Sequence, residues 1–238
     1  MQRLDILITN KKLVKSRNVA NDLIKKGKVL VNGEIITKSS KEFPEEAAIE
    51  IIEQPKFVGR GGLKLEEALE KFEVDPANLI ALDVGSSTGG FTDCLLQKGA
   101  KKVYAVDVGT DQLYETLRNN SKVISMEKTD IRNVEILPDK IDLAVIDVSF
   151  ISLELILEKV SSLLSSDGKI IALIKPQFET QKDDKNKSGI VKTDVLRERV
   201  LEKIKDFCGR INLEVLGTID SPILGGSGNK EYLILLKK

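Results

Sequence analysis

One stretch, residues 82–94, constrains the fold of this chain more than any other. An apolar run from Leu79 to Val84 stops at a glycine-rich turn, and the residues after the turn, 91–97, have the apolar spacing of a helix. A buried strand that passes through such a turn into a helix is typical of open α/β sheets, which bind ligands at the carboxyl ends of their strands. The stretch therefore predicts an α/β domain with a ligand crevice at this turn.

The spacing of the glycines favours one class of ligand. A dinucleotide site needs G-x-G-x-x-G, so that the backbone can close on a pyrophosphate at a helix N-terminus. Here Ser87 separates Gly85 from Gly89, and Asp83 would repel a pyrophosphate. The pattern instead suits S-adenosylmethionine, whose amino acid end is cationic and carries no phosphate. A plain strand, turn and helix with a capping aspartate is the alternative. The predicted cofactor-binding residues of the turn are Asp83, Gly85, Ser87, Gly89, Gly90 and Phe91.

Two further carboxylates follow predicted strands. The strand 103–106 ends at Asp107, the position that takes ribose hydroxyls in doubly wound sheets. The strand 123–126 leads to Asp130, which we expect to reach the adenine amino group, although an exposed loop aspartate is nearly as plausible. Together with the turn, these residues predict a complete adenosine site.

Composition limits the chemistry and the location of the protein. With 238 residues, of which 41% are hydrophobic and 31% charged, the chain is long enough for one large and one small globular domain. Histidine is absent, which excludes an imidazole base or ligand, and we expect no metal. Cys94 and Cys208 fall in predicted helices and are expected to be buried free thiols. No leader or membrane-length apolar run is visible, so a cytoplasmic location without a membrane partner is expected.

Residues 1–53 are predicted to form a separate α+β domain. A short helix begins near Arg3, Ser16 is expected to cap a second helix that ends at Gly27, and Asn32-Gly33 joins two short strands. Residues 1–41 carry ten Lys or Arg against three acids, whereas residues 42–53 carry five Glu and no base. A charged run is usually a solvated face, but this cluster is dense enough to meet phosphates. The candidate RNA-binding residues are Arg3, Lys11, Lys12, Lys15, Arg17, Lys25 and Lys28.

The remaining chain is divided into a linker, residues 54–59, and a second domain, residues 60–238. Pro55 prevents a continuous helix or ladder through the linker. In the second domain we expect helices near 60–72, 91–97, 112–119 and 193–208, and strands near 79–84, 103–107, 123–126, 141–147, 170–174, 212–217 and 231–235. If the last strand is antiparallel, its start lies on the same edge as the ends of the others.

That edge is expected to gather four charged side chains: Lys64, Asp147, Lys175 and Glu231. A ribose hydroxyl is a poor nucleophile at neutral pH and needs a base or acceptor placed in line with a methyl donor. Lys175 could serve if its ammonium is destabilised, with Lys64 as the neighbouring cation and the two acids orienting both amines. A lysine that only extends to solvent is the plainer alternative for Lys175.

Two resemblances cover the chain. Residues 16–33, with Ser16, Gly27 and the Asn32-Gly33 turn, resemble the alpha-L RNA-binding domain of a small-subunit ribosomal protein, which grips structured RNA through its backbone and shape. Residues 60–65, 87–96, 146–153, 175–179 and 222–231 resemble the TlyA family, also called haemolysin A.

The TlyA resemblance implies a fold, a reaction and a substrate. The fold is α/β, a Rossmann-like sheet of an FtsJ-like, S-adenosylmethionine-dependent methyltransferase, with a small α+β RNA-binding domain before it. The reaction is 2'-O-methylation of cytidine ribose in ribosomal RNA, with 23S rRNA as the expected target and 16S rRNA as a second, and it is associated with susceptibility to capreomycin and viomycin. The family's Lys-Asp-Lys-Glu tetrad corresponds to Lys64, Asp147, Lys175 and Glu231. Ribosomal RNA or a ribosomal subunit is the implied partner.

Three other functions remain open at this point. The family name prompts a membrane-active, lytic protein, although the apolar stretches are short and bounded by charges or turns. An RNA-binding protein whose second domain only senses the cofactor is another alternative. A methyltransferase for a small molecule is the third, and it would leave the basic first domain without a purpose.

Overall fold

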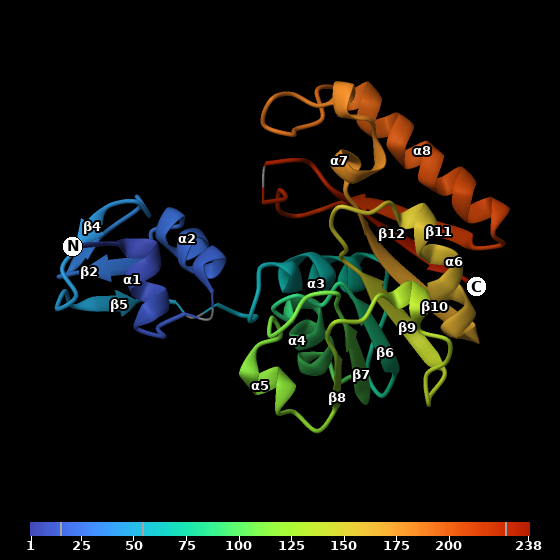
Figure 1. The fold of residues 1–238 in the computed structure, drawn as a ribbon, viewed down its shortest axis with the longest axis horizontal. Coiled ribbons are helices and arrows are strands. Elements are labelled where there is room, and N and C mark those ends of the chain that lie inside the picture. Colours follow the sequence, from blue (N-terminus) through green and yellow to red (C-terminus); the bar gives the residue numbers. More distant parts are fainter. Residues whose placement is uncertain (15, 54, 227) are drawn as a thin grey trace. The chain divides into compact units, whose positions relative to one another are not determined.

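The computed structural model describes residues 1–14, 16–53, 55–226 and 228–238. The chain folds as two compact units, Met1–Arg60 and Gly61–Lys238, which are described separately below (Figure 1). Gln54 of the expected linker and Lys15 of the expected RNA-binding set lie outside the described residues.

The first unit is a small α+β fold with its own apolar core. Its elements are β1 (Gln2–Arg3), α1 (Leu4–Asn10), α2 (Arg17–Lys25), β2 (Val29–Val31), β3 (Glu34–Ile35), β4 (Glu42–Phe43) and β5 (Ile49–Ile51). As expected, Ser16 caps α2 by accepting a hydrogen bond from the Val19 N–H. The hairpin between β2 and β3 turns at Asn32 and Gly33, both with positive φ. Leu4, Ile8, Leu23 and Ile24 from the helices pack with Val29 in the core.

The second unit is an α/β fold in which strands and helices alternate. Its elements are α3 (Gly61–Lys71), β6 (Ile80–Val84), α4 (Gly90–Gln97), β7 (Lys102–Val106), α5 (Glu115–Arg118), β8 (Val123–Met126), η1 (Ile131–Asn133), β9 (Ile141–Ile146), η2 (Leu153–Leu155), α6 (Leu157–Leu163), β10 (Leu164–Ile174), α7 (Pro176–Glu179), η3 (Lys182–Asp184), α8 (Asp194–Arg210), β11 (Glu214–Asp220) and β12 (Tyr232–Lys237).

The seven strands form one sheet in the order β11-β12-β10-β9-β6-β7-β8. Only β12 runs antiparallel to its neighbours β10 and β11, so the start of β12 lies at the edge where the parallel strands end. The strand order reverses between β6 and β9, which is where open α/β sheets bind ligands. The α/β class is thus confirmed, and the last strand is antiparallel, which is the condition on which its start was expected at this edge.

Both faces of the sheet are covered. Along β6, Leu82 and Val84 join the core that includes α6 and α8, while Ala81 and Asp83 point to the opposite face and are also fully buried. Helix α4 contacts β6 and β7 and packs against α3, and α8 lies along β11 (Figure 1). Strands buried on both faces explain why the sequence shows continuous apolar runs here rather than alternation.

Some expected boundaries were wrong. The helix expected at 112–119 is only Glu115–Arg118, because Tyr114 before it has an extended backbone, with φ −58° and ψ 138°, and its N–H donates to the Thr88 carbonyl. The backbone N–H groups of Asp111, Gln112 and Leu113 donate to Glu127. Strand β10 begins at Leu164 rather than near 170, with an irregularity in its pairing to β9. Strand β11 begins at Glu214 rather than 212 and continues to Asp220.

Candidate active site

The glycine-rich turn after β6 is shaped by two close approaches. Gly85 has φ +83°, and a Cβ there would lie 2.6 Å from the carbonyl oxygen of Asp147 at the end of β9. Gly89 has φ +96° and precedes α4, where a Cβ would collide with Leu113 and Leu117. Only glycine meets both requirements, positive φ and no side chain. The glycine at position 85 therefore allows the backbone at the end of β9 to lie directly against the turn.

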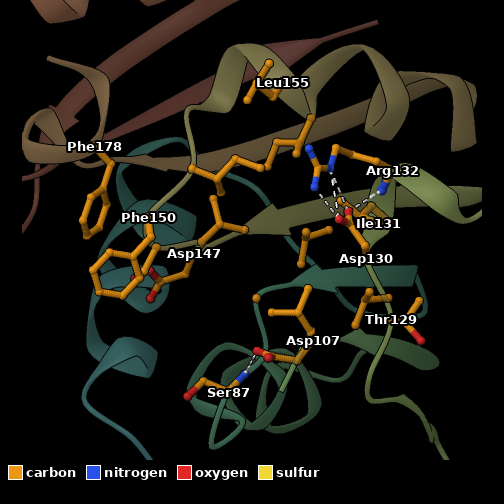
Figure 2. A pocket seen from close by; sticks show the side chains of 18 of the residues that line it. Ser87, Asp107, Thr129, Asp130, Ile131, Arg132, Asp147, Phe150, Leu155 and Phe178 are labelled. Carbon is orange, nitrogen blue, oxygen red and sulfur yellow. Dashed lines mark hydrogen bonds and ion pairs between the residues drawn. The ribbon is translucent and has the colours of Figure 1, made fainter. Parts of the chain in front are cut away.

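Asp107, at the end of β7, fastens this turn to the next strand. One carboxylate oxygen accepts a hydrogen bond from the Ser87 N–H at 2.8 Å (Figure 2). The other accepts from the Gly109 N–H at 2.7 Å. Each oxygen retains a lone pair, so the carboxylate can still accept bonds from ligand hydroxyls. Asp107 is therefore fixed in orientation and open to a ligand, as the prediction for this residue requires.

A pocket of about 750 Å³ lies over the carboxyl ends of β6, β7, β8 and β9. Its size falls in the range of small-molecule sites in proteins. One side carries Ser87, Asp107 and Asp130, and the other carries Asp147, Phe150 and Phe178 (Figure 2). Further apolar side chains, among them Val108, Ile131 and Leu155, line the pocket between these two sides.

Asp130 lies in the pocket wall but is already paired. The Arg132 guanidinium contacts both of its carboxylate oxygens, the closest at 2.6 Å, and the Arg132 N–H donates to it as well. The side-chain hydrogen bond from Arg132 is the main reason that the pKa of Asp130 is lowered. Arg132 itself lines the pocket, a position that its sequence context did not mark.

Asp83 is placed differently from the other expected cofactor residues. Its side chain is fully buried beneath the turn, where one oxygen accepts a hydrogen bond from the Thr92 hydroxyl at 2.6 Å. Its other oxygen has no hydrogen-bond partner among the described residues. Burial raises the pKa of Asp83 to about 7, and Asp147 and Asp107 add to this effect. Gly90 and Phe91 are buried at the start of α4, and neither they nor Asp83 line the pocket.

The four charged residues expected at this edge form two ion pairs. Lys64 Nζ lies 2.5 Å from Glu231 Oε2, and both side chains are buried. Lys175 Nζ lies 2.6 Å from Asp147 Oδ1 and donates to Ser149 Oγ at 2.9 Å. Each lysine is thus held by one acid, whereas the sequence suggested only that the two acids orient both amines and did not assign the pairs.

The two pairs adjoin each other through neighbouring residues. Gly61, at the start of the helix that carries Lys64, is packed close to a carboxylate oxygen of Asp147. Gln177, two residues after Lys175, donates to the second oxygen of Glu231 at 3.5 Å. Because α3, β9, β10 and β12 all contribute, the constellation depends on the complete sheet and not on a local motif.

Two aromatic residues of the site were missed by the sequence analysis. The side chain of Phe150 is 91% exposed, its φ is +65°, and its ring centroid lies 4.9 Å from that of Phe178 (Figure 2). The Phe178 ring also lies under the Lys175 ammonium, with its centroid 5.8 Å away. A large apolar side chain held in solvent at strained φ beside a charged pair is characteristic of a binding surface. The sequence did offer a signal, because Phe150 and Phe178 lie within the segments 146–153 and 175–179 that resemble the TlyA family, each three residues from a charged residue of the constellation.

The first unit presents the basic residues in two ways. Lys11, Lys12 and Lys25 are exposed, and Lys28 pairs with Glu53 at 2.7 Å. Arg3 and Arg17 both contact the fully buried Asp5, at 3.0 and 2.6 Å. Burial alone would raise the pKa of Asp5, but the hydrogen bonds from the two arginines hold it below its ordinary value. Asp5 thus brings two guanidinium groups together on the first unit.

The described residues were also compared with the requirements of a membrane span, a reactive thiol and a metal site. None of the helices there is long and apolar enough to cross a membrane. Cys94 and Cys208 are buried, and burial raises the pKa of the Cys208 thiol to about 11. In the same part of the chain, no three His, Cys, Asp or Glu side chains are grouped as metal ligands would be.

The chain is similar to known proteins over both units. Residues 57–238 match the FtsJ-like methyltransferase family, and residues 2–49 match the S4 domain family. The chain is 43% identical to Hemolysin A of Brachyspira hyodysenteriae, over 97% of this chain and 98% of the relative. It is 36% identical to the 16S/23S rRNA (cytidine-2'-O)-methyltransferase TlyA of Mycobacterium tuberculosis, over 99% of this chain and 89% of the relative.

The solved structures agree with this relationship. A putative hemolysin from Streptococcus thermophilus superimposes with a TM-score of 0.81 at 41% identity, covering 100% of this chain and 88% of that one. The family model covers most of the chain, and the curated relatives align along nearly its whole length. The chain therefore belongs to the FtsJ-like, S-adenosylmethionine-dependent methyltransferases, in the TlyA or haemolysin A branch, and carries an S4 domain before the methyltransferase domain.

Proposed function

We propose that this protein transfers a methyl group from S-adenosylmethionine to the 2'-hydroxyl of a cytidine in ribosomal RNA, with 23S rRNA as the first target and 16S rRNA as the second. Residues 1–53 would bind the RNA, residues 54–59 would link the domains, and residues 60–238 would carry out the transfer. The observation that supports this most is the pair of lysine–carboxylate contacts, Lys64–Glu231 and Lys175–Asp147, at the edge of the pocket.

The pocket has the features that S-adenosylmethionine requires. Asp107 presents a fixed carboxylate for ribose hydroxyls, and Asp130 presents another for the adenine amino group. Gly85 leaves the floor of the turn open, because a side chain there would meet the backbone of Asp147. Asp83 is fully buried beneath the turn and does not line the pocket, so its proposed role is to support the turn through the Thr92 hydrogen bond. We assign Asp107, Asp130, Gly85 and Ser87 to contact with the cofactor, and Asp83, Gly89, Gly90 and Phe91 to the shape of the turn that binds it.

The charged residues supply what the hydroxyl needs. The bound cofactor provides an electrophilic methyl group, so the protein has to orient the 2'-hydroxyl and remove its proton. Asp147 lines the pocket and holds Lys175 Nζ at 2.6 Å, so this pair receives the proton when Lys175 is in its amine form. Lys64 and Glu231 hold the hydroxyl in line from the neighbouring position. Phe150 offers an exposed ring on which a base can stack once the nucleotide has left its helix.

The first unit provides for RNA binding. Exposed lysines at 11, 12 and 25 can meet phosphates, and Arg3 and Arg17 are gathered by Asp5 with donors to spare. By binding the sugar-phosphate backbone of folded RNA, the S4-type first unit would hold the RNA so that the target nucleotide can reach the second unit. We further propose that the protein acts in the cytoplasm, where ribosomal RNA is assembled, and that loss of the methylation lowers susceptibility to capreomycin and viomycin.

The test is transfer of labelled methyl from S-adenosylmethionine to purified small subunits, large subunits and free ribosomal RNA. Label in ribose of cytidine is expected, and Lys175→Ala should lower the rate at least about 100-fold while retaining S-adenosylhomocysteine binding. Lys169→Ala is the matched control, because Lys169 lies on the same strand, β10, away from the carboxyl edge. Label in large subunits alone would assign the target to 23S rRNA. A folded, cofactor-binding protein that labels none of these substrates would contradict the proposal.

One relative's name motivates a second assay. Because Hemolysin A of Brachyspira hyodysenteriae is so similar, purified protein should also be mixed with red blood cells, with and without cofactor. Lysis that Lys175→Ala leaves unchanged would indicate a separate membrane activity. Absence of labelling with retained RNA and cofactor binding would instead favour a protein that senses the cofactor.

A further inference from the structure

Glu179, at the end of α7, is a buried acid that the proposed reaction does not use. Its side chain accepts a hydrogen bond from the Ser152 hydroxyl at 2.5 Å and from the Leu153 N–H at 2.8 Å. Ser152 also caps the short helix η2 by accepting from the Glu154 N–H. Burial raises the pKa of Glu179, and Lys203 and Glu154 are the charged groups that act on it from α8 and η2.

The segment that Glu179 holds is the segment that carries Phe150. Residues 149–152 leave the end of β9 and line the pocket. Phe150 stands in this loop at φ +65°, a left-handed conformation that is strained for an L-residue and persists only when the surroundings enforce it. With an exposed fraction of 91%, the Phe150 side chain buries too little surface to fix the loop by itself.

Three contacts from one short segment supply that enforcement. Lys175 donates to Ser149 on one flank of Phe150, and Glu179 accepts from Ser152 on the other. Between them, Phe178 meets the Phe150 ring at 4.9 Å with an interplanar angle of 49°. Lys175 is the residue before α7, and Phe178 and Glu179 are its last two residues, so one short segment touches the loop before, at and after Phe150.

We infer that Glu179 is a positioning residue, which holds the 149–152 loop against α7 and thereby sets Phe150 beside the Lys175–Asp147 pair. The inference rests on the proposed function in one respect, that Phe150 receives the target nucleotide. Glu179 itself touches neither the pocket nor the reacting groups. Its effect on the reaction should therefore pass through Phe150.

The first experiment measures the loop without any reaction. Hydrogen exchange of backbone amides 149–155 should be at least about tenfold faster in the Glu179→Ala variant of the full chain than in the unaltered protein. Glu179→Gln should restore slow exchange, because its carbonyl accepts from Leu153 N–H and its amide donates to the Ser152 hydroxyl. Asp139→Ala is the matched control: it removes two side-chain bonds, from Lys102 and Tyr104, at the amino ends of the strands. Exchange in 149–155 that stays unchanged in Glu179→Ala would overturn the inference.

The second experiment asks whether Glu179 acts through Phe150. Methyl transfer is measured for Glu179→Ala, Phe150→Ala and the double variant, with S-adenosylhomocysteine affinity as a check that the cofactor site is intact. Each single change should lower kcat/KM for RNA about tenfold or more, and the double variant should fall within about threefold of Phe150→Ala, because coupled residues are not additive.

The outcomes separate the two claims. Additive losses, or a Glu179→Gln variant as impaired as Glu179→Ala, would overturn a positioning role through Phe150. So would a Glu179→Ala variant that no longer binds S-adenosylhomocysteine, because its effect would then be on the fold. If the unaltered protein methylates no ribosomal RNA, the proposed function fails, while the exchange experiment still decides whether Glu179 holds the loop. Ser152→Ala, which leaves the Leu153 bond in place, should give a smaller acceleration of exchange in the same segment.

Discussion

At Asp83 the protein keeps a carboxylate in a place where its charge is costly. The side chain is fully buried, Thr92 donates to it, and burial is the main reason that its pKa lies at about 7. Between about pH 4 and pH 7 the folded chain therefore holds a proton that the unfolded chain releases. Stability must fall as pH rises through this window, by up to about 4 kcal/mol for a shift of this size.

The Asp83→Asn variant should remove this dependence. Asparagine can accept the same Thr92 hydrogen bond and does not ionise. We expect the stability of Asp83→Asn relative to the unaltered protein to rise with pH, so that its advantage is larger at pH 8 than at pH 5 by about 2–3 kcal/mol. Urea unfolding at both pH values measures this, with Asp206→Asn on the exposed surface of α8 as the control. An equal effect of Asp83→Asn at pH 5 and pH 8 would contradict the assignment.

Individual residues differed in how far the sequence could place them. Lys175 and Asp147 could be predicted because each ends an apolar strand, and parallel strands end at one edge of a sheet. Phe150 could not, because the left-handed backbone that exposes it is imposed by Lys175 and Glu179 from a distant segment. The burial of Asp83 was also hidden, since a carboxylate after a strand usually indicates a ligand contact.

The turn between β6 and α4 is the element on which the pocket depends. A Cβ at residue 85 would lie 2.6 Å from the Asp147 carbonyl oxygen, and φ there is +83°. We expect Gly85→Ala to destabilise the protein by about 2 kcal/mol or more and to weaken S-adenosylhomocysteine binding, because the turn and the end of β9 must move apart.

The matched control for Gly85→Ala is Gly209→Ala. Gly209 lies in the last turns of α8 with nothing within 4 Å of an added Cβ, so alanine should stabilise the helix by about 0.5–1 kcal/mol. Thermal unfolding and calorimetric titration with S-adenosylhomocysteine test both variants. Equal stability of the two variants would show that the turn adapts to a side chain.

Among the elements, those with a strong local signal were predicted best. Ser16 caps α2 and the Asn32-Gly33 hairpin forms, as predicted, and the helix expected at 193–208 is α8, which Thr193 caps. Helix α5 was overestimated because the extended backbone of Tyr114, whose N–H donates to the Thr88 carbonyl, keeps the chain out of the helix until Glu115. Tertiary hydrogen bonds of this kind have no trace in local periodicity.

At the scale of the whole chain, the net charge is zero but the basic residues are concentrated in one part of the sequence. Lys and Arg total 37 and Asp and Glu total 37, yet ten of the basic residues and only three acids fall within residues 1–41. A zero net charge would by itself suggest no nucleic acid partner, so the distribution carries the prediction. Binding to RNA phosphates releases counterions. The slope of log affinity against log salt therefore increases with the number of lysines that contact phosphates.

The triple variant Lys11→Ala, Lys12→Ala, Lys25→Ala should therefore weaken RNA binding and flatten its salt dependence together. Three lost phosphate contacts reduce the slope of log affinity against log salt by about 2–3. A triple alanine variant at Lys101, Lys122 and Lys140 is the control, since these exposed lysines precede β7, β8 and β9 at the edge opposite the pocket and the charge change is identical. Filter binding of ribosomal RNA between about 50 and 200 mM salt measures both slopes. If the two triple variants lose the same slope, RNA is held by overall charge and the first unit has no special role in recognition.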